Sequence, residues 1–314
     1  MKNSLVSVFF LLSLTGQACF AEDDIEERRA WARDYAVQGF MSDYRIQYLD
    51  AELKLALSNT LMTSPDVNRA LIEIVTNTDL PDPFRQVATG LFVADPDPSI
   101  ARDLLAELLR LIEPGTPNME GLREPLIHQI GKLLGFPAPS NDEELGAQKK
   151  TAEVVFNYTL NLEDPVQFAE LLKAISSSSI SAEVFYPFLH RVLAESNSAE
   201  KKVAAAKTLH RTSGTPTLLF ENVGKFLELV DETDVKVELV RALRYLVPPG
   251  AHWNFRDLMP EKDFEEKFQH MNPGFSFSEV YIFLKKIYLE AEDDKIKNAA
   301  YLTQLELRGW FDPN

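Results

Sequence analysis

The sequence predicts an all-α protein, an α-solenoid in which about 12–14 helices form antiparallel pairs that stack into a superhelix. Two observations support this fold class. Apolar residues recur at helical spacing along most of the chain, and no stretch of comparable length alternates as a β-strand does. Predicted helix starts at residues 165, 182, 199, 216 and 235 lie 17, 17, 17 and 19 residues apart, which is one helix of three to four turns plus a short connection.

Residues 215–247 contain one complete helix pair with both start signals. Thr215 is expected to cap the first helix, with Pro216 at its first position, where a missing N–H removes no helical hydrogen bond. Asp234 is expected to cap the second helix after a turn at 231–233. The residues expected to face inward are Leu219, Val223, Phe226, Leu227 and Val230, then Val235, Leu239, Leu243, Leu246 and Val247. Because neither helix can bury its apolar stripe alone, the pair needs neighbouring pairs.

The other helices follow from the same signals. Ser64-Pro65, Asp82-Pro83 and Asp97-Pro98 each place a capping side chain before a proline, which predicts a helix start. Gly135 is placed to end a helix. The predicted ranges outside the five regular starts are 24–38, 44–61, 67–75, 84–93, 100–112, 119–134, 145–160, 278–291 and 293–308.

The domain organisation is read from the breaks in this rhythm. Residues 22–314 are expected to form one helical-repeat domain, and the proline-rich segment after residue 136 divides it into two possible sub-arrays, 22–136 and 142–314. The largest irregularity is a long insertion at 248–278. Trp310 and Phe311 are candidates to fold back over the end of the stack, because terminal repeats must cover an otherwise open face.

Residues 1–21 have the organisation of a secretory signal peptide, with Lys2 before an apolar stretch and Ala21 as the last residue removed. The mature chain then lacks cysteine, which favours the bacterial periplasm over an animal extracellular space, where a chain of this length would normally carry disulfides. Cys19 leaves open a second interpretation, in which it is the lipidated first residue of a lipoprotein. No later stretch reaches 18 apolar residues, so no transmembrane segment is expected.

The charge balance limits the possible partners. The chain has 48 acidic and 32 basic residues, a formal net charge of −16, and the acidic residues are spread along its length. This balance disfavours nucleic acid and anionic membrane surfaces, since both attract basic proteins. A protein partner is therefore expected.

Four segments, at 82–93, 199–212, 232–247 and 293–309, resemble one another. In each, an acidic or polar residue and a basic residue precede small apolar residues and inward leucines, and in this they are similar to the second helix of HEAT and armadillo repeats. Tetratricopeptide repeats have a suitable length, but their fixed aromatic and glycine pattern does not occur. The HEAT/armadillo resemblance implies a curved, non-catalytic surface that holds other macromolecules.

The sequence gives little support to metal or cofactor chemistry. The five histidines are isolated, no His-Glu-x-x-His occurs, and no phosphate-binding glycine loop is present, so neither a metal nor a cofactor is expected. Asp95-x-Asp97-x-Ser99 begins like a calcium loop, but Ile100 stands where a glycine should make the turn. This segment is interpreted as the start of a capped helix.

The insertion at 248–278 remains as the candidate site. His252, Trp253, Phe255, Arg256 and Asp257 combine aromatic area, a guanidinium, a carboxylate and a group that titrates near neutrality. They form either a binding loop or a structural plug that fills the groove of the solenoid. The leading interpretation is thus a non-catalytic periplasmic scaffold for a protein or other extended partner. The alternative is a periplasmic hydrolase of an envelope polymer that uses a carboxylate and a histidine in the groove.

Overall fold

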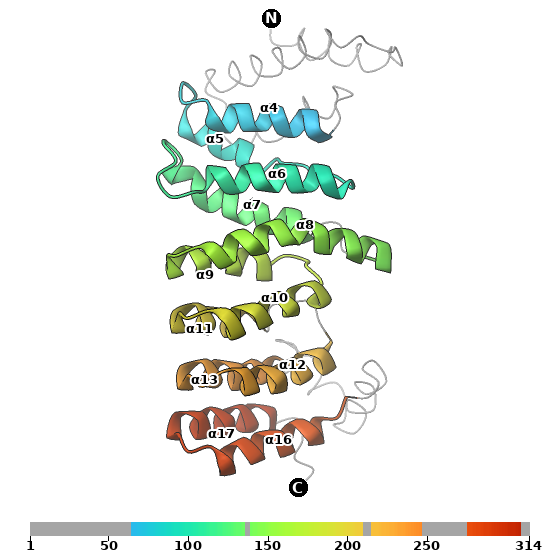
Figure 1. Ribbon diagram of the computed structural model, residues 1–314, viewed down its shortest axis with the longest axis vertical. Helices are drawn as coiled ribbons and strands as arrows, with labels where there is room; N and C mark the ends of the chain where they lie inside the picture. Colours follow the sequence, from blue (N-terminus) through green and yellow to red (C-terminus); the bar gives the residue numbers. More distant parts are fainter. Residues whose placement is uncertain (1–63, 136–138, 210–214, 247–274, 309–314) are drawn as a thin grey trace, which may run out of the picture. The chain divides into compact units, whose positions relative to one another are not determined.

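The computed structural model describes residues 64–135, 139–209, 215–246 and 275–308, in which all regular secondary structure is helical (Figure 1). These ranges contain twelve α-helices and no β-strand, which confirms the all-α prediction for the described part. The chain divides into two compact units, Met1–Gln129 and Ile130–Asn314, and each is considered by itself. The predicted helices at 24–38 and 44–61 lie outside the described residues.

The helices of the first unit surround a core of leucine and phenylalanine side chains. They are α4 (Ser64–Thr76), α5 (Asp82–Thr89), α6 (Pro98–Leu111), the short 3₁₀ helix η1 (Glu120–Leu122), and the beginning of α7 (Arg123–Gly135). Helix α4 packs against α5 and α6, and α5 packs against η1. Leu71, Phe84, Leu105, Leu108 and Leu122 are among the fully buried side chains. Helix α7 ends at Gly135, as predicted.

Residues 91–93, which have no regular structure, follow α5 in the first unit; Leu91 and Phe92 are buried, and Val93 is exposed. The backbone of this segment is satisfied by two buried amide side chains. Asn68 donates to the Val93 carbonyl and accepts from the Val93 N–H, both at 2.9 Å, and Gln129 donates to the Phe92 carbonyl at 2.9 Å. Since an unpaired backbone group at a buried position is costly, these two amides stabilise a non-helical segment beside the core.

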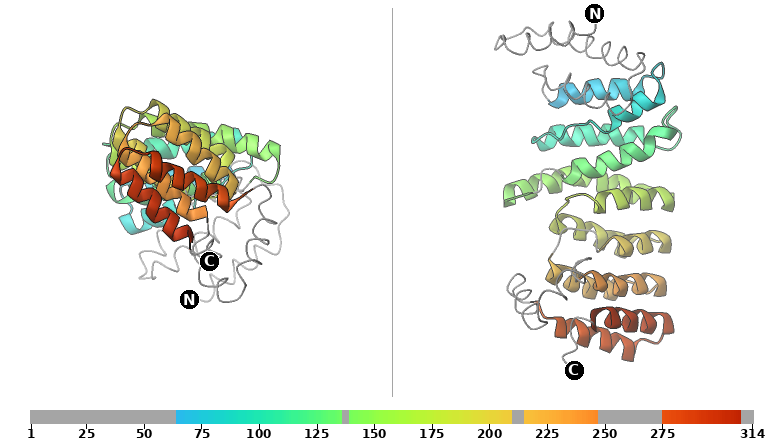
Figure 2. Two further views of the ribbon diagram at one scale, coloured as in Figure 1. Left: turned by 90° about the horizontal axis from the view of Figure 1, so that it is seen from below. Right: turned by 180° about the vertical axis from the view of Figure 1, so that it is seen from behind.

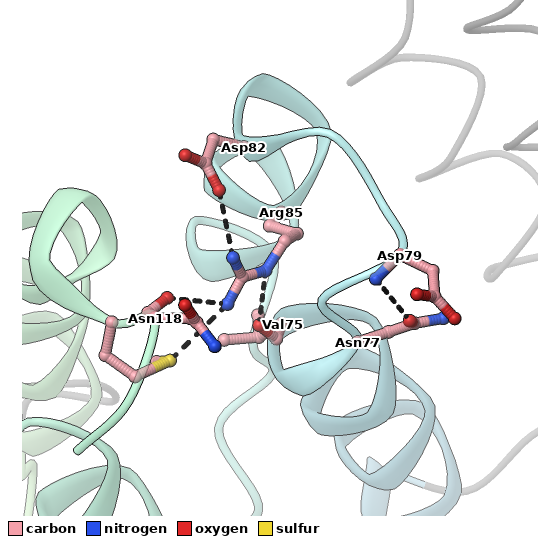
Figure 3. A network of polar contacts seen from close by, with 7 residues as sticks. Val75, Asn77, Asp79, Asp82, Arg85 and Asn118 are labelled. Atoms are coloured by element: carbon pink, nitrogen blue, oxygen red, sulfur yellow. Dashed lines mark hydrogen bonds and ion pairs between the residues drawn. The ribbon is translucent and has the colours of Figure 1, made fainter.

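Arg85 gives a second buried polar contact in the first unit (Figure 3). Its side chain is 3% exposed, and its guanidinium donates to the carbonyls of Val75 and Asn118 at 2.8 Å each. It also pairs with Asp82 at 2.9 Å. Asp82 was expected to cap α5, but α5 begins at Asp82 itself after Pro81, with no side-chain cap. That expectation was wrong because the carboxylate, placed in the first turn, meets Arg85 three residues later.

The second unit consists of helices that follow one another at short intervals. They are α8 (Asp142–Asn161), α9 (Pro165–Ser176), α10 (Ala182–Glu195), α11 (Ala199–Thr208), α12 (Pro216–Leu229), α13 (Thr233–Ala242), the 3₁₀ helix η3 (Leu243–Leu246), α16 (Phe277–Glu290) and α17 (Asp294–Arg308). Each consecutive pair, α8 with α9, α10 with α11, α12 with α13 and α16 with α17, packs together.

Neighbouring pairs are connected through two series of helices (Figures 1 and 2). The second helices of the pairs contact one another in the order α9, α11, α13, α17, and we call these four the second-helix series. The first helices contact one another in the order α8, α10, α12, the first-helix series. The described part of the second unit is therefore built from packed neighbouring helix pairs.

The predicted helix starts at 165, 182, 199 and 216 are confirmed. The fifth, at 235, was two residues late, because α13 begins at Thr233 after Glu232, and Asp234 lies in its first turn and is not its cap. The observed starts 165, 182, 199, 216 and 233 are thus 17 residues apart at every step. Two helices make a repeat of 34 residues through this region.

Side-chain caps explain why most helix starts could be predicted from the sequence. Thr215 accepts a hydrogen bond from the Leu218 N–H, and Asp164, Ser181 and Ser198 each cap the helix that follows them. These side chains satisfy N–H groups that have no partner within the helix. At Glu232 no side-chain cap forms, so the sequence offered no such signal for α13.

The buried faces of α12 and α13 agree with the predicted ones and extend beyond them. Leu219, Val223, Phe226 and Val230 of the first helix are buried, and Leu227 is half-buried. Val235, Leu239, Leu243 and Leu246 of the second are also buried, while Val247 lies outside the described residues. Val237 and Val240 are buried as well, because α13 touches α11, α12 and α17 and so has a wider covered arc than a helix with one neighbour.

Candidate functional site

The site predicted from the sequence, His252, Trp253, Phe255, Arg256 and Asp257, lies outside the described residues. It stays a prediction, and so do both of its interpretations, the binding loop and the structural plug. The described side chains offer a second candidate site, on the second unit.

Open hollows occur on the described part of the second unit, and three of them are each lined in part by helices of the second-helix series. The first has a volume of about 660 Å³ and lies where α8 and α10 end and where α9 and α11 begin. The second, of about 470 Å³, lies at the beginnings of α11, α13 and α17. The third, of about 380 Å³, is lined farther along the same three helices. We call them hollow 1, hollow 2 and hollow 3.

Hollow 1 presents amide and hydroxyl groups around the side chain of one half-buried lysine. Lys201 donates to the Leu162 carbonyl, and its ammonium lies 5.6 Å from the centroid of the Phe168 ring. Because that ammonium is already bound, it orders the α8–α9 connection. Exposed Arg191 reaches Glu195 only at 3.9 Å, a weak surface pair that leaves the guanidinium able to bind another acceptor. The remaining polar lining is Asn157, Asn161, Ser196, Asn197 and Ser198.

Hollows 2 and 3 are lined by charges of both signs. Hollow 2 contains Glu200, Glu232, Asp234, Asp293 and Lys295. Asp234 and Lys295 continue into hollow 3, where Lys207, Glu238, Arg241 and Asn298 join them. Arg241 pairs with Glu238 at 2.9 Å within the same helix, and Lys295 pairs with Asp234 at 3.1 Å across two helices. The surface can thus offer donors and acceptors alternately to a partner.

Polar contacts tie the beginnings of α11, α13 and α17 together. Lys202 on α11 donates to Glu232 at 2.8 Å, and the Thr233 hydroxyl donates to Asp293 at 2.9 Å. The hydrogen bond from Lys202 is the main cause of the lowered pKa of Glu232. The pKa of Asp293 is lowered chiefly by the backbone N–H of Lys295 and then by the Thr233 hydroxyl. Both carboxylates are therefore ionised at neutral pH. Their hydrogen bonds connect α11 to the start of α13, and α13 to the start of α17.

Sequence reasoning singled out none of these side chains as a site. The similar segments did contain a sequence signal for this surface. Lys201, Lys202 and Lys295 each lie close to a helix start, next to acidic residues with which such lysines could pair. The spacing could not reveal that the lysine of one pair meets the carboxylate of the next, because that contact joins residues 30 positions apart.

The described side chains contain no group of three or more His, Cys, Asp and Glu placed to hold a metal ion. The calcium-like segment is a helix start, as interpreted from the sequence, because Asp97 accepts from the Ser99 N–H at 2.8 Å and Asp95 accepts from the Asp97 N–H at 2.8 Å. The two histidines that the structure describes, His128 and His190, are both exposed.

None of the helices in the described ranges combines the length and the apolar character that crossing a bilayer requires.

The candidate site is interpreted from its own geometry. No protein-family model, curated protein or solved structure matches this chain.

Proposed function

We propose that the protein is a secreted, periplasmic, non-catalytic scaffold whose second unit is a HEAT/armadillo-like α-solenoid. Along the second-helix series it holds an extended protein partner. The uniform 17-residue spacing of helix starts and the two series of contacts between neighbouring pairs support the solenoid.

The single observation that carries the binding proposal is the succession of hollows 1, 2 and 3 along one series of helices. Hollows 1 and 2 follow one another in the direction in which the pairs succeed one another, and hollow 3 adjoins hollow 2 farther along the same three helices. A small molecule would need one enclosed pocket. A row of open, separate hollows suits a chain that places successive side chains in them.

The chemistry of the lining favours a polypeptide as the partner. The amides of Asn157, Asn161 and Asn197 both donate and accept, as peptide groups require. Arg241 and Glu238 offer opposite charges within one hollow. A phosphate backbone would instead need a continuous basic groove, which the described lining of the three hollows does not provide.

Site-specific photo-crosslinking in the periplasm tests this proposal. A photoreactive residue replacing Lys207 or Arg241, both exposed beside hollow 3, should give a discrete crosslinked product. The same residue replacing Glu221 or Lys225, exposed on α12 in the first-helix series, should give none. Equal products from both series would refute a partner site on the second helices.

The insertion at 248–278 is the competing location, and a paired comparison separates the two. Combined Trp253→Ala and Arg256→Ala should weaken capture by at least about 2 kcal/mol if the insertion binds the partner. Combined Lys207→Glu and Arg241→Glu should weaken it if the second-helix series does. Loss of capture in the first variant alone, with an unchanged melting temperature, would assign binding to the insertion.

A further inference from the structure

The last helix pair carries most of the exposed apolar side chains in the described part of the chain. Ten large hydrophobic residues are exposed among all the described residues, and seven of these ten lie on the pair α16 and α17. Those on α17 are Tyr301, Leu302 and Leu305, between 42% and 46% exposed, and those on α16 are Tyr281, Ile282, Tyr288 and Leu289. The rings of Tyr288 and Tyr301 lie 6.0 Å apart and join the two helices. We call these seven residues the terminal apolar patch.

The α17 part of the patch lies on the last described member of the second-helix series. Helix α11 packs between α9 and α13, and α13 packs between α11 and α17. Helix α17 has α13 on one side, and no further helix of the series follows it among the described residues. The side chains that a next pair would cover are therefore left open. An apolar patch of this kind usually marks a contact surface.

We propose that the chain's own segment 309–314 covers the α17 part of this patch, with Trp310 seated on Leu305 and Leu302. Gly309 follows Arg308, the last residue of α17, and stands four residues after Leu305, a spacing that corresponds to the same face of a helix. Glycine after a helix commonly takes the left-handed conformation, and the apolar residue that follows it then contacts the last helical turn. With Gly309 in that position, the two residues that meet are Trp310 and Leu305.

The covalent connection favours this occupant over a second molecule. Segment 309–314 is joined directly to the end of α17, so it is present at a high effective concentration near the patch and loses no translational freedom when it docks. Trp310 and Phe311 supply two adjacent aromatic side chains, which bury large areas. A second copy of the protein, or the partner of the proposed scaffold, would have to displace them.

Tryptophan fluorescence tests the proposal. Of the three tryptophans, Trp31 and Trp253 are replaced by Phe, so that Trp310 is the single emitter in the full chain. Its quenching by acrylamide should be much weaker than in the urea-unfolded chain. Combined Leu302→Ala and Leu305→Ala should raise the quenching constant to the unfolded value. The control is Leu229→Ala on α12, a leucine of similar exposure, which should leave quenching unchanged.

Each other outcome overturns the proposal. Quenching equal to that of the unfolded chain would mean that Trp310 is uncovered. Protection that is unaffected by the two leucine changes would place Trp310 elsewhere. Protection that appears only as the protein concentration rises, together with a doubled mass in sedimentation, would assign the patch to a second copy.

Discussion

Arg85 is a buried charge whose main partners are backbone carbonyls. Its planar guanidinium reaches the carbonyls of Val75 and Asn118, which belong to segments more than 40 residues apart (Figure 3). Asp82, its ionic partner, has a side chain that is 78% exposed. The ion pair therefore contributes little, and the two carbonyl contacts contribute most.

Arg85→Lys should lower the free energy of unfolding by about 2 kcal/mol, because an ammonium cannot bridge both carbonyls in the same plane. Asp82→Ala should cost less than about 0.5 kcal/mol, since its carboxylate is already solvated. Urea unfolding of both variants measures the difference. Equal losses would show that the ion pair is the main stabilising contact.

Several exposed carboxylates have a lowered pKa because they accept hydrogen bonds at helix starts. For Asp97 the donors are the Ser99 hydroxyl and then its backbone N–H, and for Glu144 they are the backbone N–H and then the hydroxyl of Ser140. A group whose pKa is lower in the folded state stabilises it fully above the unfolded pKa. That stabilisation is lost as the pH falls through the folded pKa.

The free energy of unfolding should accordingly decrease as the pH falls below about 4. In the variant Asp97→Asn with Glu144→Gln this decrease should be shallower, because two of the titrating groups are gone. At neutral pH the variant should differ little from the wild type, since asparagine also caps helices well. Unfolding curves across the acid range measure both slopes, and a steeper slope in the variant would contradict the assignment.

Two glycines of α7 lie very close to neighbouring backbone in the second unit, Gly131 to α9 and Gly135 to the segment that follows α9. A Cβ at Gly131 would lie 2.4 Å from the Ala174 carbonyl oxygen, and a Cβ at Gly135 would lie 2.3 Å from the Ser179 nitrogen. Gly146, in α8, has nothing within 4 Å of the same position. Two glycines in the same unit thus differ only in what they face.

Gly131→Ala should destabilise the protein although alanine is the better helix former, because the contact is with backbone that cannot move alone. Gly146→Ala should stabilise it by about 0.5–1 kcal/mol through helix propensity. Thermal unfolding of both variants compares them under one condition. A stabilising Gly131→Ala would show that α7 and α9 can separate at little cost.

The buried face of α13 supports a second prediction for a whole element. Leu239 and Leu243 are fully buried, and Lys236 is half-buried. Either leucine changed to alanine should destabilise by about 2–5 kcal/mol, whereas Lys236→Ala should cost less than about 0.5 kcal/mol. Urea unfolding measures the three variants, and equal losses would mean that the lysine stem is part of the core.

For the whole molecule, the absence of strands from the described residues predicts a strongly helical far-ultraviolet circular dichroism spectrum. A sheet content near one quarter, the average for globular proteins, would contradict the all-α fold for the entire chain. The spectrum includes the residues outside the described ranges, so it also tests the helices predicted at 24–38 and 44–61.

The helices could be predicted because their signals are local. Thr215-Pro216 and Asp97-Pro98 each combine a cap with a proline at the first helical position, and both starts are confirmed. The start of α13 was placed two residues late because Glu232 makes no side-chain cap and offered no such signal. The candidate site could not be predicted, because Lys202 and Glu232 meet only when neighbouring pairs pack.

The sequence alone determined the helical class and the 17-residue spacing of helix starts from 165 to 216, since apolar periodicity and capping depend on residues within four positions of each other. The tertiary structure decided which side chains share a surface. Lys295 meets Asp234 across 61 positions, Asn68 holds the backbone of Val93 across 25, and Gly131 lies against α9. No local sequence pattern encodes such contacts. They form only when helices with similar apolar faces stack, and a similar face does not specify which neighbour it will contact.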